Sequence, residues 1–186
     1  MTIQFVTTNT GKFQEVSAKL AEHNVRITQL DRSYPEIQTD RLEKVVKFAA
    51  TILDDEVHGD YLIDDSGLFI EALGGFPGVY SAYAHRRLGN GGILKLLAEE
   101  RNRAARFETV FLLRRGLEHE VLHGDVSGAI AEQARGTSGF GFDPIFLPEG
   151  STRTFGEMTL AEKNRISHRS KAVEALISAL TSPKEP

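Results

Sequence analysis

The alternation of strand-like and helix-like segments over the first 65 residues constrains the fold of this chain most strongly. Three short apolar segments are separated by two segments whose apolar residues recur at helical spacing. The expected elements are a strand at Thr2–Val6, a helix from Asn9 or Thr10 to about Glu22, a strand at Val25–Leu30, a helix opened by an Asp40–Glu43 capping box and running through about Leu53, and a strand at Tyr61–Ile63. This β-α-β-α-β order predicts an α/β protein built in layers.

The second half of the chain changes period, because Phe107, Thr109, Phe111 and Leu113 alternate with other residues as in a strand. The expected elements begin with a loop at Gly74–Gly78 and a helix with Ile93, Leu94, Leu96 and Leu97 on its buried face. An antiparallel meander follows, with a turn at Arg114–Gly116 and strands at Glu120–Val126 and Gly128–Ala131. The chain then has a capping box at Thr159–Glu162, a helix after Ser167 with Ala172, Val173, Leu176, Ile177 and Leu180 inward, and a frayed end at Thr181–Pro186.

The segment His119-Glu-Val-Leu-His123 matches the H-E-x-x-H motif of zinc peptidases. Two histidines at this spacing lie about 5–6 Å apart on a helix and can share one metal. On a strand they lie about 13 Å apart, because a strand rises about 3.3 Å per residue. The meander places the segment on a strand, so the sequence favours a solvated hairpin edge over a zinc site.

Composition narrows the class of protein further. The net charge of −4 disfavours non-specific binding to nucleic acid or membrane, which requires a basic face. The absence of cysteine excludes disulfides and Cys-zinc sites. No apolar run approaches the roughly 18 residues of a membrane span. We therefore expect a cytoplasmic protein of one domain, residues 1–186.

A candidate phosphate loop follows the first strand, at Thr7-Thr8-Asn9-Thr10-Gly11-Lys12. A helix that starts after a strand directs backbone N–H groups and a positive dipole end at an anion, and Lys12 adds a charge. The loop is not a Walker A motif, which would require Gly at Val6 and Ser or Thr at Phe13. A capped helix start with an incidental lysine explains the segment equally well.

Two carboxylates, Asp64 and Asp65, follow the apolar strand at Tyr61–Ile63 and precede Ser66-Gly67. Adjacent buried carboxylates repel each other, and a divalent cation relieves the repulsion. One carboxylate could hold Mg²⁺ while the other orients or deprotonates a water. The alternative is a turn in which Asp and Ser bond to their own backbone. The doublet favours a functional site.

A third segment, Ser138-Gly-Phe-Gly-Phe-Asp-Pro144, combines glycines with aromatic rings, which suits stacking on a nucleotide base. A turn with two core phenylalanines is the alternative. Downstream, Lys163 and Arg169 lie near expected helix starts, where a cation is unfavourable. A bound anion or polar ligand would explain them better than stability does, although a solvated surface remains open for either one.

These segments together resemble the inosine triphosphate pyrophosphatase family, also described as XTP/dITP or non-standard purine nucleoside triphosphate pyrophosphatases, and most closely its archaeal-type branch. The resemblance spans nearly the whole chain. It rests on five motifs in order: FVTTNTGKFQEV, YPEIQ with LEKVVKFAA, DDSGLFIEALGGFPGVYSA, GFGFDPIF and FGEMTLAEKNRISHR.

The resemblance implies an elongated mixed β-sheet flanked by helices, with two lobes, approximately 1–75 plus 135–186 and 76–134, and the active-site cleft between them. It implies hydrolysis of ITP, dITP and XTP to the monophosphate and pyrophosphate with Mg²⁺, with Mn²⁺ possible, and removal of these nucleotides from the pool. It also implies a homodimer.

The resemblance further implies roles for particular residues. Asp65 would be the proton acceptor and a metal ligand, Glu36 the second metal ligand, and Lys12 would act on the phosphates. The substrate-binding set would be Thr7, Thr8, Asn9, Thr10, Gly11, Lys12, Ser66, Phe140, Gly141, Phe142, Asp143, Lys163, His168 and Arg169. Two departures stand out: Thr8 replaces a common glycine, which would strain a backbone with φ > 0, and Asp64 replaces a Glu found in some relatives.

Two other functions remain open. A Maf-like pyrophosphatase would prefer pyrimidine nucleotides, and the SHR and GFGFDP segments argue against it. A nucleotide sensor would bind without hydrolysis, and the Asp64-Asp65 doublet argues against it, because a binding protein has little use for two repelling carboxylates.

Overall fold

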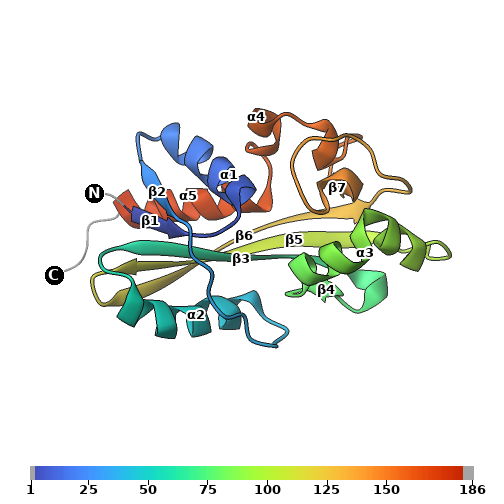
Figure 1. Ribbon diagram of the computed structural model, residues 1–186. Coiled ribbons are helices and arrows are strands. Elements are labelled where there is room, and N and C mark those ends of the chain that lie inside the picture. The colour runs from blue at the N-terminus through green and yellow to red at the C-terminus, as the bar shows by residue number, and fades with distance from the viewer. Residues whose placement is uncertain (1–2, 182–186) are drawn as a thin grey trace. The chain divides into compact units, whose positions relative to one another are not determined.

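In the computed structural model, which describes residues 3–181, seven strands form one mixed sheet flanked by helices (Figure 1). The strand order is β2-β1-β3-β5-β6-β7, and β4 pairs with β3. β1 is parallel to β2 and β3, whereas β3–β4 and β6–β7 are antiparallel. The strands are β1 (Ile3–Val6), β2 (Ile27–Leu30), β3 (Tyr61–Ile70), β4 (Pro77–Gly78), β5 (Ala104–Arg115), β6 (Glu118–Ile130) and β7 (Phe146–Pro148). The predicted α/β class with a mixed sheet is confirmed.

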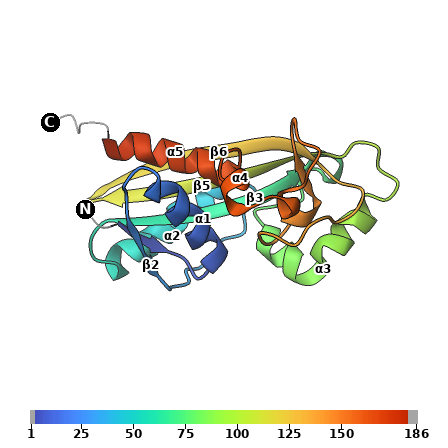
Figure 2. The same cartoon turned by 90° about the horizontal axis from the view of Figure 1, so that it is seen from above.

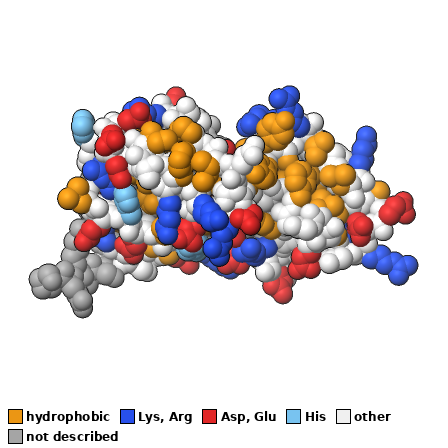
Figure 3. Space-filling model, turned by 90° about the horizontal axis from the view of Figure 1, so that it is seen from below, with side chains coloured by type: hydrophobic (Ala, Val, Ile, Leu, Met, Phe, Trp, Pro, Cys, Tyr) orange, Lys and Arg blue, Asp and Glu red, His pale blue; other side chains and the backbone are white. Residues whose placement is uncertain are grey.

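Five α-helices and three short 3-10 helices complete the described fold. The α-helices are α1 (Thr10–Ala21), α2 (Leu42–Glu56), α3 (Ser81–Leu96), α4 (Leu160–Lys163) and α5 (His168–Thr181). The 3-10 helices are Glu71–Leu73, Asp143–Ile145 and Phe155–Glu157. Within residues 3–181, none of the helices combines the length and apolar character that crossing a membrane requires. On the face drawn in Figure 3, Lys and Arg side chains are interspersed with Asp and Glu.

Contacts divide the chain into two compact units. The first contains the described residues of Met1–Asp65, Thr109–Gly124 and Arg169–Pro186, and the second contains Ser66–Glu108 and Asp125–His168. The boundaries of these units differ from the lobe ranges expected from the sequence. The lobes and the cleft between them stay a prediction.

In the first unit, α1 and α5 lie side by side on one face of the strands and α2 lies on the other (Figures 1 and 2). The expected apolar faces form these contacts, since Val16 and Leu20 of α1 and Ala172, Val173 and Leu176 of α5 are fully buried. They pack in one cluster with Ile3, Phe5, Leu62 and Phe111 of the sheet. Full burial of such apolar side chains contributes about 1.5–3 kcal/mol each. Ile177 and Leu180 are partly buried.

In the second unit, buried residues of β3, α3, β5, β6 and the segment 142–158 form a separate cluster. Ile93 and Leu97 are buried as predicted, but Leu96 is 50% exposed. The prediction for Leu96 was wrong because four apolar residues among the five at 93–97 span more of a helix surface than one buried stripe can cover.

The strand expected at Tyr61–Ile63 is longer than predicted, because β3 continues through Asp64 and Asp65 to Ile70. The carboxylates therefore occupy the middle of a strand and not a turn after it. Leu68 and Ile70 are fully buried, and their burial explains why the strand continues. Successive strand residues point to opposite faces of a sheet, so the Asp64 and Asp65 side chains leave β3 on different sides.

The meander is also simpler than predicted. Arg114 and Arg115 lie within β5, the turn is at Gly116-Leu117, and the two short strands expected at 120–131 are one strand, β6. Gly116 has φ 64°, the left-handed conformation that tight hairpin turns require. His119 and His123 lie on β6, so the preference for a strand over a zinc-binding helix is confirmed.

The predicted helix caps have mixed outcomes. Asn9 caps α1, and the Thr159–Glu162 capping box is present at α4. The box predicted at Asp40–Glu43 is absent, because Arg41 is the N-cap of α2 and makes no side-chain cap bond. Glu43 instead forms an ion pair with Lys47, one helical turn further along. The first strand begins at Ile3, and Thr2 and residues 182–186 lie outside the described part of the chain.

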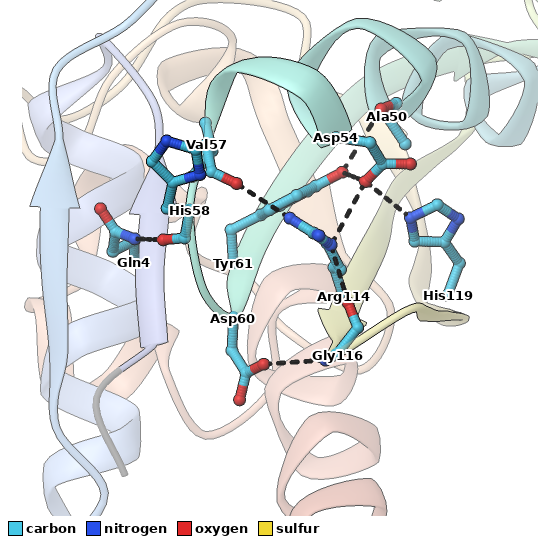
Figure 4. Close-up of polar contacts among 10 residues, drawn as sticks. All are labelled: Gln4, Ala50, Asp54, Val57, His58, Asp60, Tyr61, Arg114, Gly116 and His119. Carbon is cyan, nitrogen blue, oxygen red and sulfur yellow. Dashed lines mark hydrogen bonds and ion pairs between the residues drawn. The ribbon is translucent and has the colours of Figure 1, made fainter.

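A polar network in the first unit joins α2 to the β5–β6 hairpin (Figure 4). The Tyr61 hydroxyl donates a hydrogen bond of 2.7 Å to Asp54, and His119 lies 3.0 Å from the same carboxylate oxygen. Arg114 lies 3.5 Å from it and donates a hydrogen bond to the Val57 carbonyl. An acidic residue in the last turn of a helix opposes the helix dipole, and the two basic side chains compensate for it.

The network shifts the pKa values of both of its acidic groups, Asp54 and Tyr61. Partial burial raises the pKa of Asp54, but hydrogen bonds from Tyr61 and His119 and the charges of His119 and Arg114 lower it, so that the pKa lies below its usual 3.8. Burial and the neighbouring Asp54 raise the pKa of Tyr61 well above its usual value. The Asp54 carboxylate is therefore the form that the fold stabilises.

We expect Asp54→Asn to destabilise the protein at neutral pH, because the hydrogen bonds and charge pairs of the carboxylate are lost. The pKa of Asp54 is lower in the folded protein than in the unfolded chain, so its carboxylate contributes stability in full at pH values above 3.8. This contribution disappears as the pH falls through the pKa of the folded state. Urea unfolding of wild type and variant should therefore differ at pH 7 and converge at more acidic pH. Asp55→Asn, at the exposed neighbouring position, is the control and should change little. A difference that does not change with pH would contradict this account.

Candidate active site

The predicted phosphate loop lies at the start of α1 in the first unit. The Asn9 side chain accepts a hydrogen bond of 3.0 Å from the Lys12 amide, and Gln29 of β2 donates one of 2.9 Å to the Thr7 carbonyl. Thr7 is buried, whereas Thr8, Asn9 and Thr10 are exposed, and Gly11 and Lys12 are half-buried. An exposed helix start of this kind can bind an anion through its backbone amides.

The strain considered for Thr8 is absent. Among the described residues, Asn24 is the only non-glycine with positive φ. Thr8 therefore adopts an ordinary backbone conformation that does not require glycine.

A buried charge cluster connects α1, β3 and α5. Lys12 lies 3.1 Å from the Asp64 carboxylate, and Arg169 lies 3.9 Å from it. Arg169 also forms an ion pair with Glu15 of α1. Asp64, Glu15 and Arg169 are almost completely buried. The cluster holds two positive and two negative groups, which is how a protein interior accommodates charge.

The cluster corrects one expectation. Arg169 is the second residue of α5, but it pairs with protein carboxylates, so no bound ligand is required to explain a cation there. Asp64 likewise has Lys12 and Arg169 as cationic partners within the protein. A role for Asp64 follows, because this carboxylate holds the Lys12 ammonium at the start of α1.

The charges of three carboxylates act on Tyr34, in the segment between β2 and α2. The Tyr34 hydroxyl donates a hydrogen bond of 2.8 Å to the Asp64 carbonyl. Burial raises the pKa of Tyr34 well above its usual value, and the charges of Asp64, Asp65 and Glu36 raise it further. In the sequence, Glu36 lies in a loop far from Asp64 and Asp65. Tyr34 lies in the same loop and connects it to β3 by its hydrogen bond to the Asp64 carbonyl.

Glu36 and Asp65 fit a magnesium ion by their chemistry. Mg²⁺ prefers oxygen ligands, and it is usually held by one or two carboxylates with waters and substrate phosphates. Among residues 3–181, no three His, Asp or Glu side chains form a cluster that could hold a metal by themselves. Two carboxylates that act on the same tyrosine suit an ion that completes its coordination with water and phosphate.

In the second unit, Asp143 organises the Gly-aromatic turn. Its carboxylate accepts a hydrogen bond of 2.8 Å from the Phe140 amide and forms an ion pair of 2.6 Å with Lys163. Gly139 has φ 73°, and a Cβ there would lie 2.0 Å from the Asp143 carboxylate. Only glycine allows this close approach. Phe140 is half-buried, so its ring remains partly available.

Lys163 lies at the end of α4 and not near a helix start as expected. Its side chain is 3% exposed, and its ammonium lies 5.0 Å from the centre of the Phe140 ring and 5.4 Å from that of Phe155. The cation therefore supports the aromatic turn from one side, through Asp143 and through the ring of Phe140.

Helix α3 contacts the same turn. Asn90 donates a hydrogen bond of 3.2 Å to the Gly141 carbonyl, and the His85 ring meets the Phe142 ring edge-on at 5.1 Å. Phe142 is buried in the core of the unit, so Phe140 is the ring of the turn that is placed to meet a ligand. Ser66 is half-buried, and His168 is buried against the ring of Phe107.

Sequence reasoning missed several residues that the structure places at these groups. Glu15 had the weak signal of a charged residue next to Val16 on the buried side of α1. Tyr34, Asn90 and Phe107 had no local signal, because their roles depend on partners 30 to 61 residues away.

The fold and these two groups of side chains define an α/β protein with an exposed, lysine-bearing helix start and an ordered aromatic turn. Comparison with known proteins identifies the family: residues 3–179 match the Ham1 family, and the chain belongs to it. A dITP/XTP pyrophosphatase of Thermococcus kodakarensis is 53% identical over 173 residues, which are 93% of this chain and 94% of the relative. One from Pyrococcus horikoshii is 47% identical over 97% of both chains.

A solved structure supports the same assignment. A HAM1 protein from Coxiella burnetii superimposes with a TM-score of 0.81 at 30% identity, covering 96% of this chain and 98% of that one. The family resemblance found in the sequence is confirmed.

We expect Asp143→Ala to destabilise the protein by about 3–5 kcal/mol, because it leaves the Lys163 ammonium buried without its carboxylate. The measurement is urea unfolding at pH 7. The double variant Asp143→Asn with Lys163→Met removes both charges and retains an acceptor for the Phe140 amide, so it should be more stable than Asp143→Ala. Equal stability of the two variants would show that the buried charge is not the cause.

Proposed function

We propose that this protein is a nucleoside triphosphate pyrophosphatase that hydrolyses non-standard purine nucleotides, ITP, dITP and XTP, to the monophosphate and pyrophosphate. The observation that carries the proposal is the 3.1 Å contact of Lys12 with Asp64, because it brings the start of α1 next to the strand that carries Asp65. Relatives named dITP/XTP pyrophosphatase match this chain over nearly its full length.

The triphosphate would be bound by Thr7 to Lys12 and by Arg169. The backbone amides at the start of α1 and the Lys12 ammonium stabilise negative charge on the leaving pyrophosphate. Asp64 contributes indirectly, because it positions both cations.

Asp65 is proposed as the general base. A water oxygen forms a bond to the α-phosphorus, the bond from that phosphorus to the bridging oxygen breaks, and Asp65 accepts the proton of the water. When bound by Glu36 and Asp65, Mg²⁺ would neutralise phosphate oxygens. Ser66, the next residue of β3, would contact the substrate.

The purine base would be recognised by the glycine-aromatic turn and the side chains next to it. Phe140 would offer its ring face to the purine and Gly141 its backbone, and Phe142 and Asp143 would support them. Lys163 and His168 would complete the base-binding set. Donors that face the purine O6 would be left unpaired by a 6-amino group, and such mismatches discriminate strongly between substrates.

The decisive experiment measures pyrophosphate release from ITP, XTP, dITP, ATP, GTP, dTTP and UTP with Mg²⁺ at equal concentrations. We expect the first three to be strongly preferred, with the monophosphate as co-product. Preference for dTTP or UTP would move the protein to the Maf-like function, and tight binding without release would make it a sensor.

We expect Asp65→Asn to lower kcat for ITP by about 10²–10⁴-fold, the usual contribution of a general base, while the melting temperature stays near that of wild type. Asp64→Asn is the matched comparison in the same strand. It should lower the melting temperature, because Lys12 and Arg169 lose their buried counter-charge. In the folded variant it should mainly raise KM for ITP, because it releases Lys12 without removing the general base. Near-normal kcat in Asp65→Asn would exclude Asp65 as the base.

Three further features stay predictions: the homodimer and the use of Mg²⁺, with Mn²⁺ as the alternative, which the family resemblance implies, and the cytoplasmic location, which the composition favours. Sedimentation equilibrium tests the dimer. Titration of the protein with each metal in the absence of nucleotide tests the metal, and Glu36→Gln should weaken that binding.

A further inference from the structure

The rings of Phe107 and His168 form the flattest aromatic stack in the described part of the chain. Their centroids are 4.6 Å apart and their planes differ by 10°. Phe107 belongs to β5 and is 7% exposed, and His168 is the first residue of α5 and is 2% exposed. Both belong to the second unit.

Two other phenylalanines hold the Phe107 ring. Phe146 meets it at 4.7 Å with an angle of 61°, and Phe155 lies 6.3 Å away at 25°. Both are fully buried and contact each other at 5.2 Å. Interiors packed at this density leave a ring few alternative rotamers. The plane that Phe107 presents to His168 is therefore set by the core.

The plane of a histidine ring decides what it can bind, because its two nitrogens lie in that plane and their hydrogen bonds point outward along it. A flat ring stacked on the imidazole restrains rotation of that plane. We propose that Phe107 is a positioning residue that orients the His168 imidazole and thereby sets discrimination between purines. The inference rests on the proposed function, in which His168 contacts the base.

Phe146 provides a matched control within the same cluster. It is buried even more completely than Phe107, and its ring contacts are with Phe107 and Phe155. Phe146→Leu therefore shows how the loss of a core ring alone changes stability and activity. Phe107→Leu shows this effect together with the loss of the stack on His168.

The experiment measures kcat and KM for ITP and ATP, the melting temperature and the NMR resonances of the His168 ring in both variants. We expect both variants to melt earlier. Phe107→Leu should reduce the ratio of kcat/KM for ITP over ATP by about tenfold or more, since a misoriented imidazole loses its contact with the preferred base. Most of this change should appear in KM for ITP. Phe146→Leu should leave the ratio within about twofold of wild type.

The His168 ring protons should shift downfield in Phe107→Leu, because they lose the shielding face of the phenyl ring, and stay in place in Phe146→Leu. Where either leucine variant fails to fold, the methionine pair Phe107→Met and Phe146→Met replaces it, because methionine fills irregular gaps.

Equal changes in the two variants, in the substrate ratio or in the His168 resonances, would overturn the inference. His168→Ala separates this failure from that of the proposed function. If His168→Ala retains full preference for ITP, His168 does not read the base and the inference falls with that assignment. If wild type releases no pyrophosphate from ITP, the proposed function fails, and the NMR comparison still decides whether Phe107 orients the ring.

Discussion

The buried Asp64 carboxylate is the constraint on which the first unit depends. It lies in the middle of β3, and it is compensated by Lys12 of α1 and Arg169 of α5. Removing a charge from water costs several kcal/mol, and the cost is recovered only when oppositely charged groups are held at short distance. The packing of α1 and α5 on the same face of the sheet supplies those groups. Folding of this unit therefore also positions the Lys12 and Arg169 side chains.

The second unit uses the same principle at a different place. Asp143 and Lys163 form a buried ion pair, and Asp143 also fixes the amide of Phe140. A turn rich in glycine would be flexible by itself, because glycine has the largest conformational freedom in the unfolded chain. The ion pair, Asn90 and the packing of Phe142 hold this turn in one conformation. A ring such as Phe140 can meet a planar ligand at low entropic cost only if it is already ordered.

Charge neutralisation inside the protein also explains how an acidic chain can serve an anionic substrate. The net charge is −4, but the cations at the candidate site are local and are held by partners of opposite sign. A substrate phosphate would meet amides and ammonium groups already in position, so little reorganisation is needed during reaction. Tyr34 extends this order to the segment that carries Glu36, because its hydroxyl donates a hydrogen bond to the Asp64 carbonyl.

The sequence by itself determined the fold class, the order of helices and strands, the capped start of α1, the strand that carries His119 and His123, and the family. These features depend on periodicity, capping residues and motifs, all of which are local along the chain. Only the tertiary structure decided that Asp64 and Asp65 lie within a strand, that Lys12 and Arg169 pair with Asp64, that Lys163 pairs with Asp143, and that Phe107 stacks on His168. Each of these contacts joins residues that are far apart in sequence or reverses a local preference. Burial, which sets both the length of β3 and the pairing of its charges, is a property of the packed chain and not of any single segment.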